Sequence, residues 1–166
     1  MPLLVDRLPL HCWVDKSCTP AAEHWSVRLP ALPSPPHGPP LPTARAQDWV
    51  LDIGFTGEAL AWRHHLEDAG LDPDTDRDLP VSLRWSATGA KTQAPVRLAN
   101  LWLLSTIAHQ APFLLRLVGG IVFNDKRVVT PDPELHRALI GMRPLIRAGL
   151  KLEVDFASRT FSLWTP

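Results

Sequence analysis

The sequence predicts a mainly β fold, in the form of a small closed β-barrel with one or two short helices. Short apolar runs recur along all 166 residues, and Pro, Gly and Asp interrupt them at spacings that suit strands and loops. The chain holds 18 prolines, and helical periodicity is confined to residues 58–71 and 142–148. No repeat of about 20 to 50 residues is visible. Many short strands without a repeat are typical of a small sheet that closes on itself.

Length and composition favour one domain that is soluble. A chain of 166 residues buries one sizeable core and is short for two. Because 17 basic side chains balance 17 acidic ones, bulk charge predicts no binding to nucleic acid or to an anionic membrane. No apolar run approaches the roughly 20 residues that cross a bilayer. Asp6 and Arg7 interrupt the segment where a signal peptide would be apolar, so we expect a cytoplasmic protein.

The two cysteines, Cys12 and Cys18, are too few for a structural zinc site, although His11 and His24 lie near them in the sequence. We therefore expect free thiols in a reducing compartment and no bound metal.

The first half of the chain contains two predicted strands and a proline-rich segment. Residues 24–32 alternate well enough for a strand. Prolines then follow so closely that we expect residues 30–43 to form a surface loop or arm, either a spacer or a PxxP ligand. Residues 49–53 (WVLDI) predict a buried strand. Residues 58–71 predict a short helix, or a strand followed by a helix, with Gly70 at its C-terminal end.

A hairpin with a flexible tip is predicted between residues 79 and 104. Its connection, ATGAKTQ at 87–93, is small and polar, and Gly89 tolerates positive φ. A further strand pair is expected at 112–125, around Gly119 and Gly120.

The C-terminal third predicts an apolar strand that runs into Gly141, followed by a short helix. The helix is expected from Met142 to about Ala148, with Pro144 in its first turn and Gly149 as its stop. A closing hairpin is then expected, with strands at 151–156 and 161–164.

The order of three motifs resembles the retropepsin-like, or retroviral-type, aspartic proteases. The motifs are VLDIGFTG at 50–57, the hairpin at 79–104, and ALIGMRPLIRAGLKLEVDF at 138–156. Phe-Thr-Gly after the Asp-x-Gly turn is similar to the bacterial branch of that family. The resemblance covers about residues 46–164 and implies a closed barrel of the retropepsin type, with the N-terminal strands as its opening hairpin.

This resemblance implies a homodimeric endopeptidase without a cofactor, in which one Asp52 from each chain lies at the two-fold axis. Two carboxyl groups about 3 Å apart cannot both ionise, so they share one proton. One of them activates a water, and the other donates to the scissile carbonyl of a polypeptide substrate. The second motif would be Leu139, Ile140 and Gly141. A flap would cover the substrate, with Trp85 at its base and Thr88, Gly89, Ala90 and Lys91 at its tip.

One position departs from the family pattern. Retropepsins carry Thr or Ser between the Asp and the Gly, and that hydroxyl bonds across the dimer axis, whereas this chain has Ile53. Losing such a bond costs about 0.5–1.5 kcal/mol, and less when both partners become apolar together. Gly54 is expected to bring its amide to the Asp52 carboxylate, and Thr56 is the nearest alternative source of a hydroxyl.

Structural explanations compete with these roles. Asp52 is open to an interpretation as a turn aspartate that caps its own loop, and Gly141 as an ordinary junction between strand and helix. His64 and His65 are expected on a solvated helix face, not at a metal or general-base site. Asp155 is expected to be exposed or to bind its own turn.

Three functions remain open on these grounds. The first is an aspartic endopeptidase that acts as a homodimer. The second is a catalytically weak or inactive dimer of the same fold that serves protein association. The third is a β-rich binding module that uses its proline-rich arm.

Overall fold

The structure is a computed structural model that describes residues 1–76, 82–85 and 91–166. Over these residues the chain is mainly β, as predicted, with fifteen strands and two short helices. The elements are β1 (Leu3–Pro9), β2 (His11–Asp15), β3 (Ala22–Ser26), β4 (Arg28–Ser34), β5 (Gln47–Leu51), β6 (Ala59–Trp62), α1 (Arg63–Asp68), β7 (Ser82–Trp85), β8 (Lys91–Ala94), β9 (Val96–Arg97), β10 (Asn100–Leu103), β11 (Phe113–Leu115), β12 (Ile121–Asn124), β13 (Ala138–Ile140), α2 (Met142–Arg147), β14 (Lys151–Asp155) and β15 (Thr160–Trp164). Of the helices described, neither has the length and apolar character to cross a membrane.

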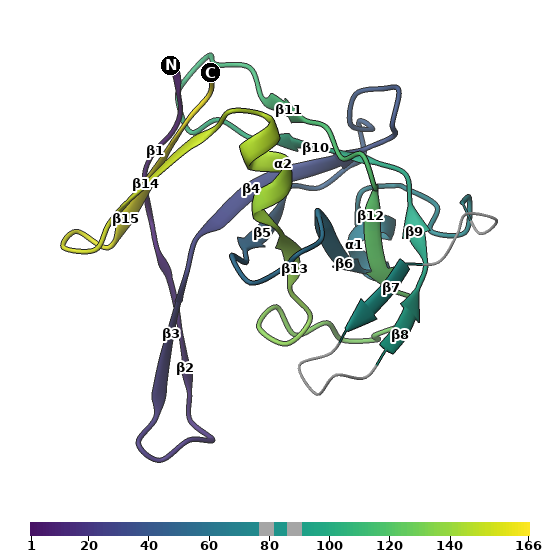
Figure 1. The fold of residues 1–166 in the computed structure, drawn as a ribbon, viewed down its shortest axis with the longest axis horizontal. Coiled ribbons are helices and arrows are strands. Elements are labelled where there is room, and N and C mark those ends of the chain that lie inside the picture. The colour runs from purple at the N-terminus through teal and green to yellow at the C-terminus, as the bar shows by residue number, and fades with distance from the viewer. Residues whose placement is uncertain (77–81, 86–90) are drawn as a thin grey trace.

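Eight strands form the central sheet in the order β11-β10-β4-β5-β13-β6-β12-β9. β13 lies between β5 and β6, parallel to β5 and antiparallel to β6. A segment near the end of the chain is thus inserted between the two strands that the Asp52 turn connects (Figure 1). Within the described residues no pairing joins the edge strands β11 and β9, so the sheet is open where a closed barrel was expected.

A second sheet holds both ends of the chain. It has the order β1-β15-β14, and the amide of Thr165 donates to the carbonyl of Pro2 at 2.9 Å. β2 and β3 pair only with each other among the described strands and extend away from the body (Figure 1). The expected closing hairpin is therefore present as β14 and β15, while the N-terminal strands form this sheet and the extension.

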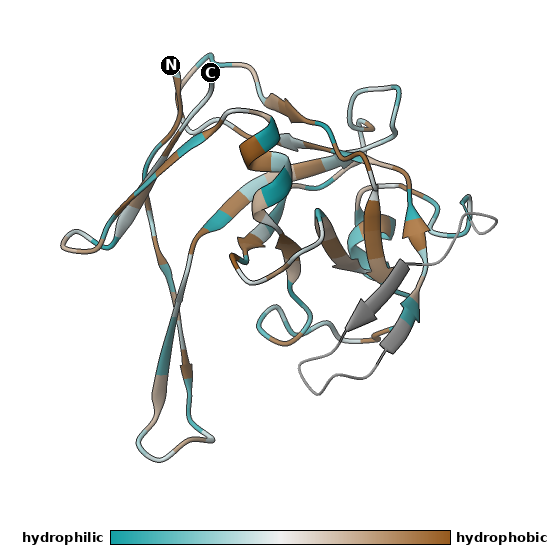
Figure 2. Ribbon diagram, viewed as in Figure 1, coloured by the Kyte–Doolittle hydropathy of each residue, from teal (hydrophilic) through white to brown (hydrophobic). Residues whose placement is uncertain are grey.

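One hydrophobic core joins the central sheet to β1, β15 and both helices. Its largest side chains that are essentially inaccessible to solvent are Trp49 of β5, Phe123 of β12 and Phe161 of β15. In Figure 2, β12 and β13 are coloured as hydrophobic, whereas β2 and β3 contain both hydrophobic and hydrophilic residues. Burial of a side chain of this size contributes about 1.5–3 kcal/mol, and Trp49 belongs to the strand that leads into the Asp52 turn.

The proline-rich segment is partly a strand: the loop expected at 30–43 was wrong for residues 30–34, whereas the overlapping strand expected at 24–32 holds for residues 30–32. β4 lies between β10 and β5 although it contains Pro30 and Pro33. Proline keeps φ near −65°, which extended backbone accepts, and it removes only its own donor. The carbonyl of Pro30 still accepts from the Leu104 amide at 2.8 Å. Pairing on both sides therefore outweighs the missing donors.

Three other predicted strands differ in extent or pairing. The strand expected at 24–32 breaks at Val27 into β3 and β4. The second arm of the hairpin expected at 79–104 divides into β8, β9 and β10. The strand pair expected at 112–125 exists as β11 and β12, but these pair with β10 and with β6 and β9 instead of with each other.

At 58–71 the second predicted alternative holds, a strand (β6) followed by a helix (α1), and α2 begins and ends close to the predicted residues. α1 follows β6 directly, and Gly70 beyond its end has φ 71°, in the left-handed region that glycine favours. α2 starts after Gly141, and Gly149 has φ 68°.

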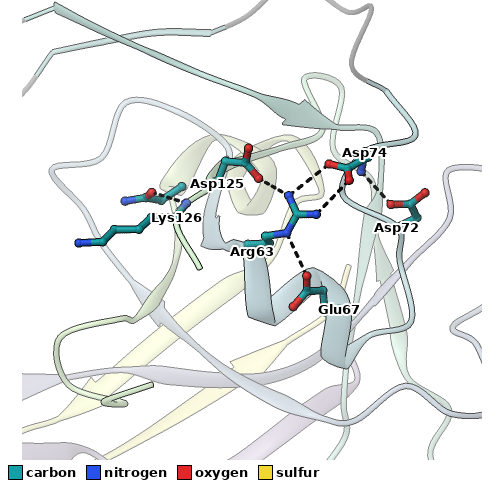
Figure 3. Close-up of polar contacts among 7 residues, drawn as sticks. Arg63, Glu67, Asp72, Asp74, Asp125 and Lys126 are labelled. Carbon is teal, nitrogen blue, oxygen red and sulfur yellow. Dashed lines mark hydrogen bonds and ion pairs between the residues drawn. The ribbon is translucent and has the colours of Figure 1, made fainter. Parts of the chain in front are cut away.

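A cluster of charges centred on Arg63 holds α1 in place. The guanidinium, 11 % exposed, contacts Glu67 at 2.9 Å within the helix and Asp74 at 3.0 Å in the next loop. It also binds Asp125, which follows β12 (Figure 3). One buried cation thus joins the helix to two loops that are distant in the sequence.

Candidate active site

Asp52 opens the turn between β5 and β6, and hydrogen bonds fix the main chain on both sides of it. Its amide donates to the Ile140 carbonyl at 2.9 Å, and its carbonyl accepts from the Phe55 amide at 3.2 Å. Its Oδ1 accepts from the Gly54 amide at 2.9 Å, as the sequence predicted. A Cβ on Gly54 would stand 3.4 Å from Oδ1, and its φ lies outside the left-handed region, so this turn does not depend on glycine there.

The second motif reaches the first through β13. Leu139 and Ile140 stand beside Val50 and Leu51 in the register with β5. Strand pairing thereby brings together two motifs that are far apart in the sequence.

Gly141 packs against the backbone of the Asp52 turn. Its amide donates to the Glu58 carbonyl at 2.9 Å. A Cβ on Gly141 would lie 2.2 Å from the Gly57 carbonyl oxygen, and a Cβ on Gly57 would lie 2.4 Å from the Phe55 ring. Glycine at 141 is therefore a packing requirement, because its Cβ would meet backbone atoms, whereas at 57 it would meet only the partly exposed Phe55 ring.

Glu58 joins the Asp52 turn to two other elements, and the sequence did not single it out. Its Oε2 accepts from the Gly119 amide at 2.9 Å, and its Oε1 pairs with Arg147 of α2 at 2.5 Å. Arg147 also donates to the Arg116 carbonyl at 2.7 Å. The Glu58 side chain is only 13 % exposed, so the turn is held to α2 and to the loop before β12. No sequence signal marks it, because its partners lie 61 and 89 residues away.

Ile53 and Thr56 both lie at the surface of the turn. Ile53 is 83 % exposed, which is unusual for so large an apolar side chain. Thr56 is exposed, and in the part of the chain that the structure describes its hydroxyl has no hydrogen-bond partner. Within one chain, neither side chain supports the Asp52 carboxylate.

A cleft of about 300 Å³ opens beside Asp52. One wall is the outer face of β5 and β13, where Val50 and Leu139 alternate with core residues. The opposite wall comes from β2 and β3, including Trp13 and His24. The candidate acid thus lies at the edge of a concave surface.

The predicted flap is described only in part. β7 and β8 pair in an antiparallel register that sets Trp85 opposite Lys91. Thr88, Gly89 and Ala90 lie outside the described residues. The hairpin itself is therefore present, and its approach to Asp52 stays a prediction.

The expectation of a solvated face was wrong for His65. Its Nδ1 accepts from the Trp62 amide at 3.1 Å, and its ring lies 4.1 Å from that of His64, centroid to centroid. Burial, and next the neighbouring His64, lower the pKa of His65 to about 4. Burial also lowers the pKa of His64. These rings serve the junction between β6 and α1.

Asp155 binds its own turn, as predicted. Hydrogen bonds from Ser158 and from the Ala157 amide lower its pKa. Cys12 and Cys18 are free thiols. Among the described residues no three His, Cys, Asp or Glu side chains are arranged to hold a metal ion.

Comparison with known proteins adds no assignment. No protein-family model matches the chain, and no curated protein and no solved structure matches it either.

Proposed function

We propose that this protein is an aspartic endopeptidase that acts as a homodimer in the cytoplasm. Asp52 of each subunit would supply one carboxyl group of a pair that activates a water and hydrolyses a peptide bond. The fold would be of the retropepsin type, with the β7–β8 hairpin as the flap and no cofactor.

One observation carries this proposal: β13 lies between β5 and β6 and seats Gly141 on the turn that begins with Asp52. A turn aspartate that only caps its own loop does not need a second motif packed against it. The amide of Gly54 already binds Oδ1, so the carboxylate is oriented before any substrate arrives.

Dimerisation follows from the chemistry. Hydrolysis needs a base that takes a proton from the attacking water and an acid that donates a proton to the carbonyl oxygen. Two carboxyl groups that share one proton provide both. This chain has one Asp-x-Gly turn with a matching second motif, so the second carboxyl group must come from Asp52 of the partner subunit.

Cleavage of unfolded casein at acidic pH tests the proposal. We expect wild-type protein to cut it, pepstatin to inhibit, and Asp52→Asn to lower the rate by about 100-fold or more. Asp155→Asn is the matched control, because Asp155 is an exposed turn aspartate with similar amide bonds. Sedimentation should give a dimer for all three proteins. A stable monomer, or full activity in Asp52→Asn, contradicts the proposal.

The alternative is a catalytically weak or inactive dimer of the same fold that serves protein association. Ile53 favours it, because an exposed isoleucine replaces the hydroxyl that supports the family's catalytic turns. This alternative predicts a dimer without cleavage at any pH. Gain of cleavage in Ile53→Thr would show that the missing hydroxyl alone silences the pair.

A further inference from the structure

Side chains of the β2–β3 hairpin, most of them from one face, line the cleft beside Asp52. Trp13 pairs with His24 across the hairpin, and His11 pairs with Ser26. Because successive side chains alternate along a strand, these four share a face, and Cys12 and Val14 belong to the other. All four of the first set line the cleft, and Trp25, which pairs with Cys12 on the other face, lines it as well.

The base of the hairpin is fixed against the body. His11 Nε2 lies 2.8 Å from Glu134 Oε1, and Arg28 binds both oxygens of the same carboxylate at 2.8 and 2.9 Å. Glu134 belongs to the loop that leads into β13. These contacts fix the position of the base of the hairpin relative to β13, the strand that carries the second motif.

The walls of the cleft suit a flat aromatic ring. Trp13 stacks on His24 with ring centroids 5.2 Å apart and planes 29° from parallel. Leu139 and Ile53 add apolar surface, and Arg137 adds a guanidinium that is not paired with any carboxylate in the described part of the chain. Aromatic rings stack on other rings and on guanidinium groups. A cleft of about 300 Å³ is large enough for one such side chain and its main chain.

We propose that this cleft is a specificity site that binds an aromatic side chain of the polypeptide next to the bond that Asp52 cleaves, with Trp13 as its main contact. The inference rests on the proposed function, because Asp52 lines the same cleft. It assigns substrate selection to β2 and β3, a hairpin that lies outside the central sheet.

Cleavage sites in unfolded casein, identified by mass spectrometry, give the first test. Wild-type protein is expected to favour an aromatic residue over alanine on one side of the cut bond by about 10-fold or more. Trp13→Ala should remove that preference, and Trp13→Phe should keep it. Val14→Ala is the control, since Val14 lies on the opposite face of β2 and is 41 % exposed. An unchanged preference in Trp13→Ala, or a wild-type preference for another class of residue, overturns the inference and leaves the proposed function intact.

Binding without cleavage gives the second test. Calorimetry would compare acetylated, amidated hexapeptides of alanine with and without two central phenylalanines, using Asp52→Asn protein. We expect the phenylalanine peptide to bind at least 10-fold more tightly, and Trp13→Ala in the same background to abolish the difference. If wild-type protein cuts nothing but this difference is present, the proposed function fails and the aromatic site stands. If the two peptides bind equally, the aromatic site is wrong whatever the cleavage result.

Discussion

Gly141 and Gly57 lie against each other where the two motifs meet, and this contact leaves no space for a methyl group. A Cβ on Gly141 would lie only 2.2 Å from the Gly57 carbonyl oxygen. Backbone atoms cannot rotate away as a flexible side chain can. A Cβ at Gly141 must therefore displace the Asp52 turn or β13.

Gly141→Ala is expected to destabilise the fold by about 1–3 kcal/mol, the usual cost of overpacking. Gly54→Ala is the matched control in the same turn, because its Cβ would meet Asp52 Oδ1 at 3.4 Å, an ordinary contact. Urea unfolding followed by tryptophan fluorescence would measure both. Equal stability of the two variants would mean that the motifs are not in close contact.

Single residues show which parts of the site the sequence could predict. The amide of Gly54 at the Asp52 carboxylate was predictable, because an Asx turn depends on neighbours two residues apart. The role of Glu58 was not predictable, because its partners Gly119 and Arg147 come near it only in the folded chain. The burial of His65 was not predictable either, because it depends on packing against β5, which lies elsewhere in the sequence.

At the scale of elements, local sequence patterns located most strands and both helices. They did not predict which strands pair with each other. β13 has three residues, and the adjacent Gly141 made it recognisable. Its insertion between β5 and β6 depends on the whole sheet. β4 shows the opposite case, since Pro30 and Pro33 are strong local breakers that pairing with β5 and β10 overrides.

The side chain of Glu58 joins three elements, and its removal should loosen the Asp52 turn. In Glu58→Ala the Gly119 amide and the Arg147 guanidinium lose their shared acceptor, which is expected to cost about 1–3 kcal/mol. Glu153→Ala is the control, because Glu153 is 62 % exposed and its contact with Lys151 is 3.3 Å long. Surface pairs of that kind contribute about 0–1 kcal/mol. Urea unfolding should separate the two variants, and equal loss would contradict a structural role for Glu58.

At the scale of the whole molecule, two systems of strands meet at the site. The central sheet carries Asp52 and the second motif, and the β2–β3 hairpin adds a wall from outside that sheet. The sequence indicated the mainly β class because its short apolar runs and turn residues are local features. It did not indicate the open sheet or the extension, since both depend on which strands pair.

The proposed cleavage takes place at acidic pH, and the free energy of unfolding should also decrease at acidic pH. The pKa of His65 is about 4 in the folded chain and about 6.5 in the unfolded chain. Between these values the unfolded state binds more protons, so the free energy of unfolding decreases as pH falls from about 6.5 to about 4. The shift sets the maximal loss from His65 at about 3 kcal/mol, and His64, whose pKa is also lowered, adds loss of the same sign.

Urea unfolding at a series of pH values would measure this loss. His65→Gln is expected to flatten the curve between pH 6.5 and 4, because glutamine does not titrate and its Oε1 can accept the Trp62 amide. His37→Gln is the control, since His37 is exposed, and its curve should match that of the wild-type protein. If His65→Gln keeps the full slope, other groups cause the acid sensitivity. If it flattens the slope and the acid limit of casein cleavage also moves to lower pH in this variant, that limit reflects unfolding of the chain and not the chemistry of Asp52.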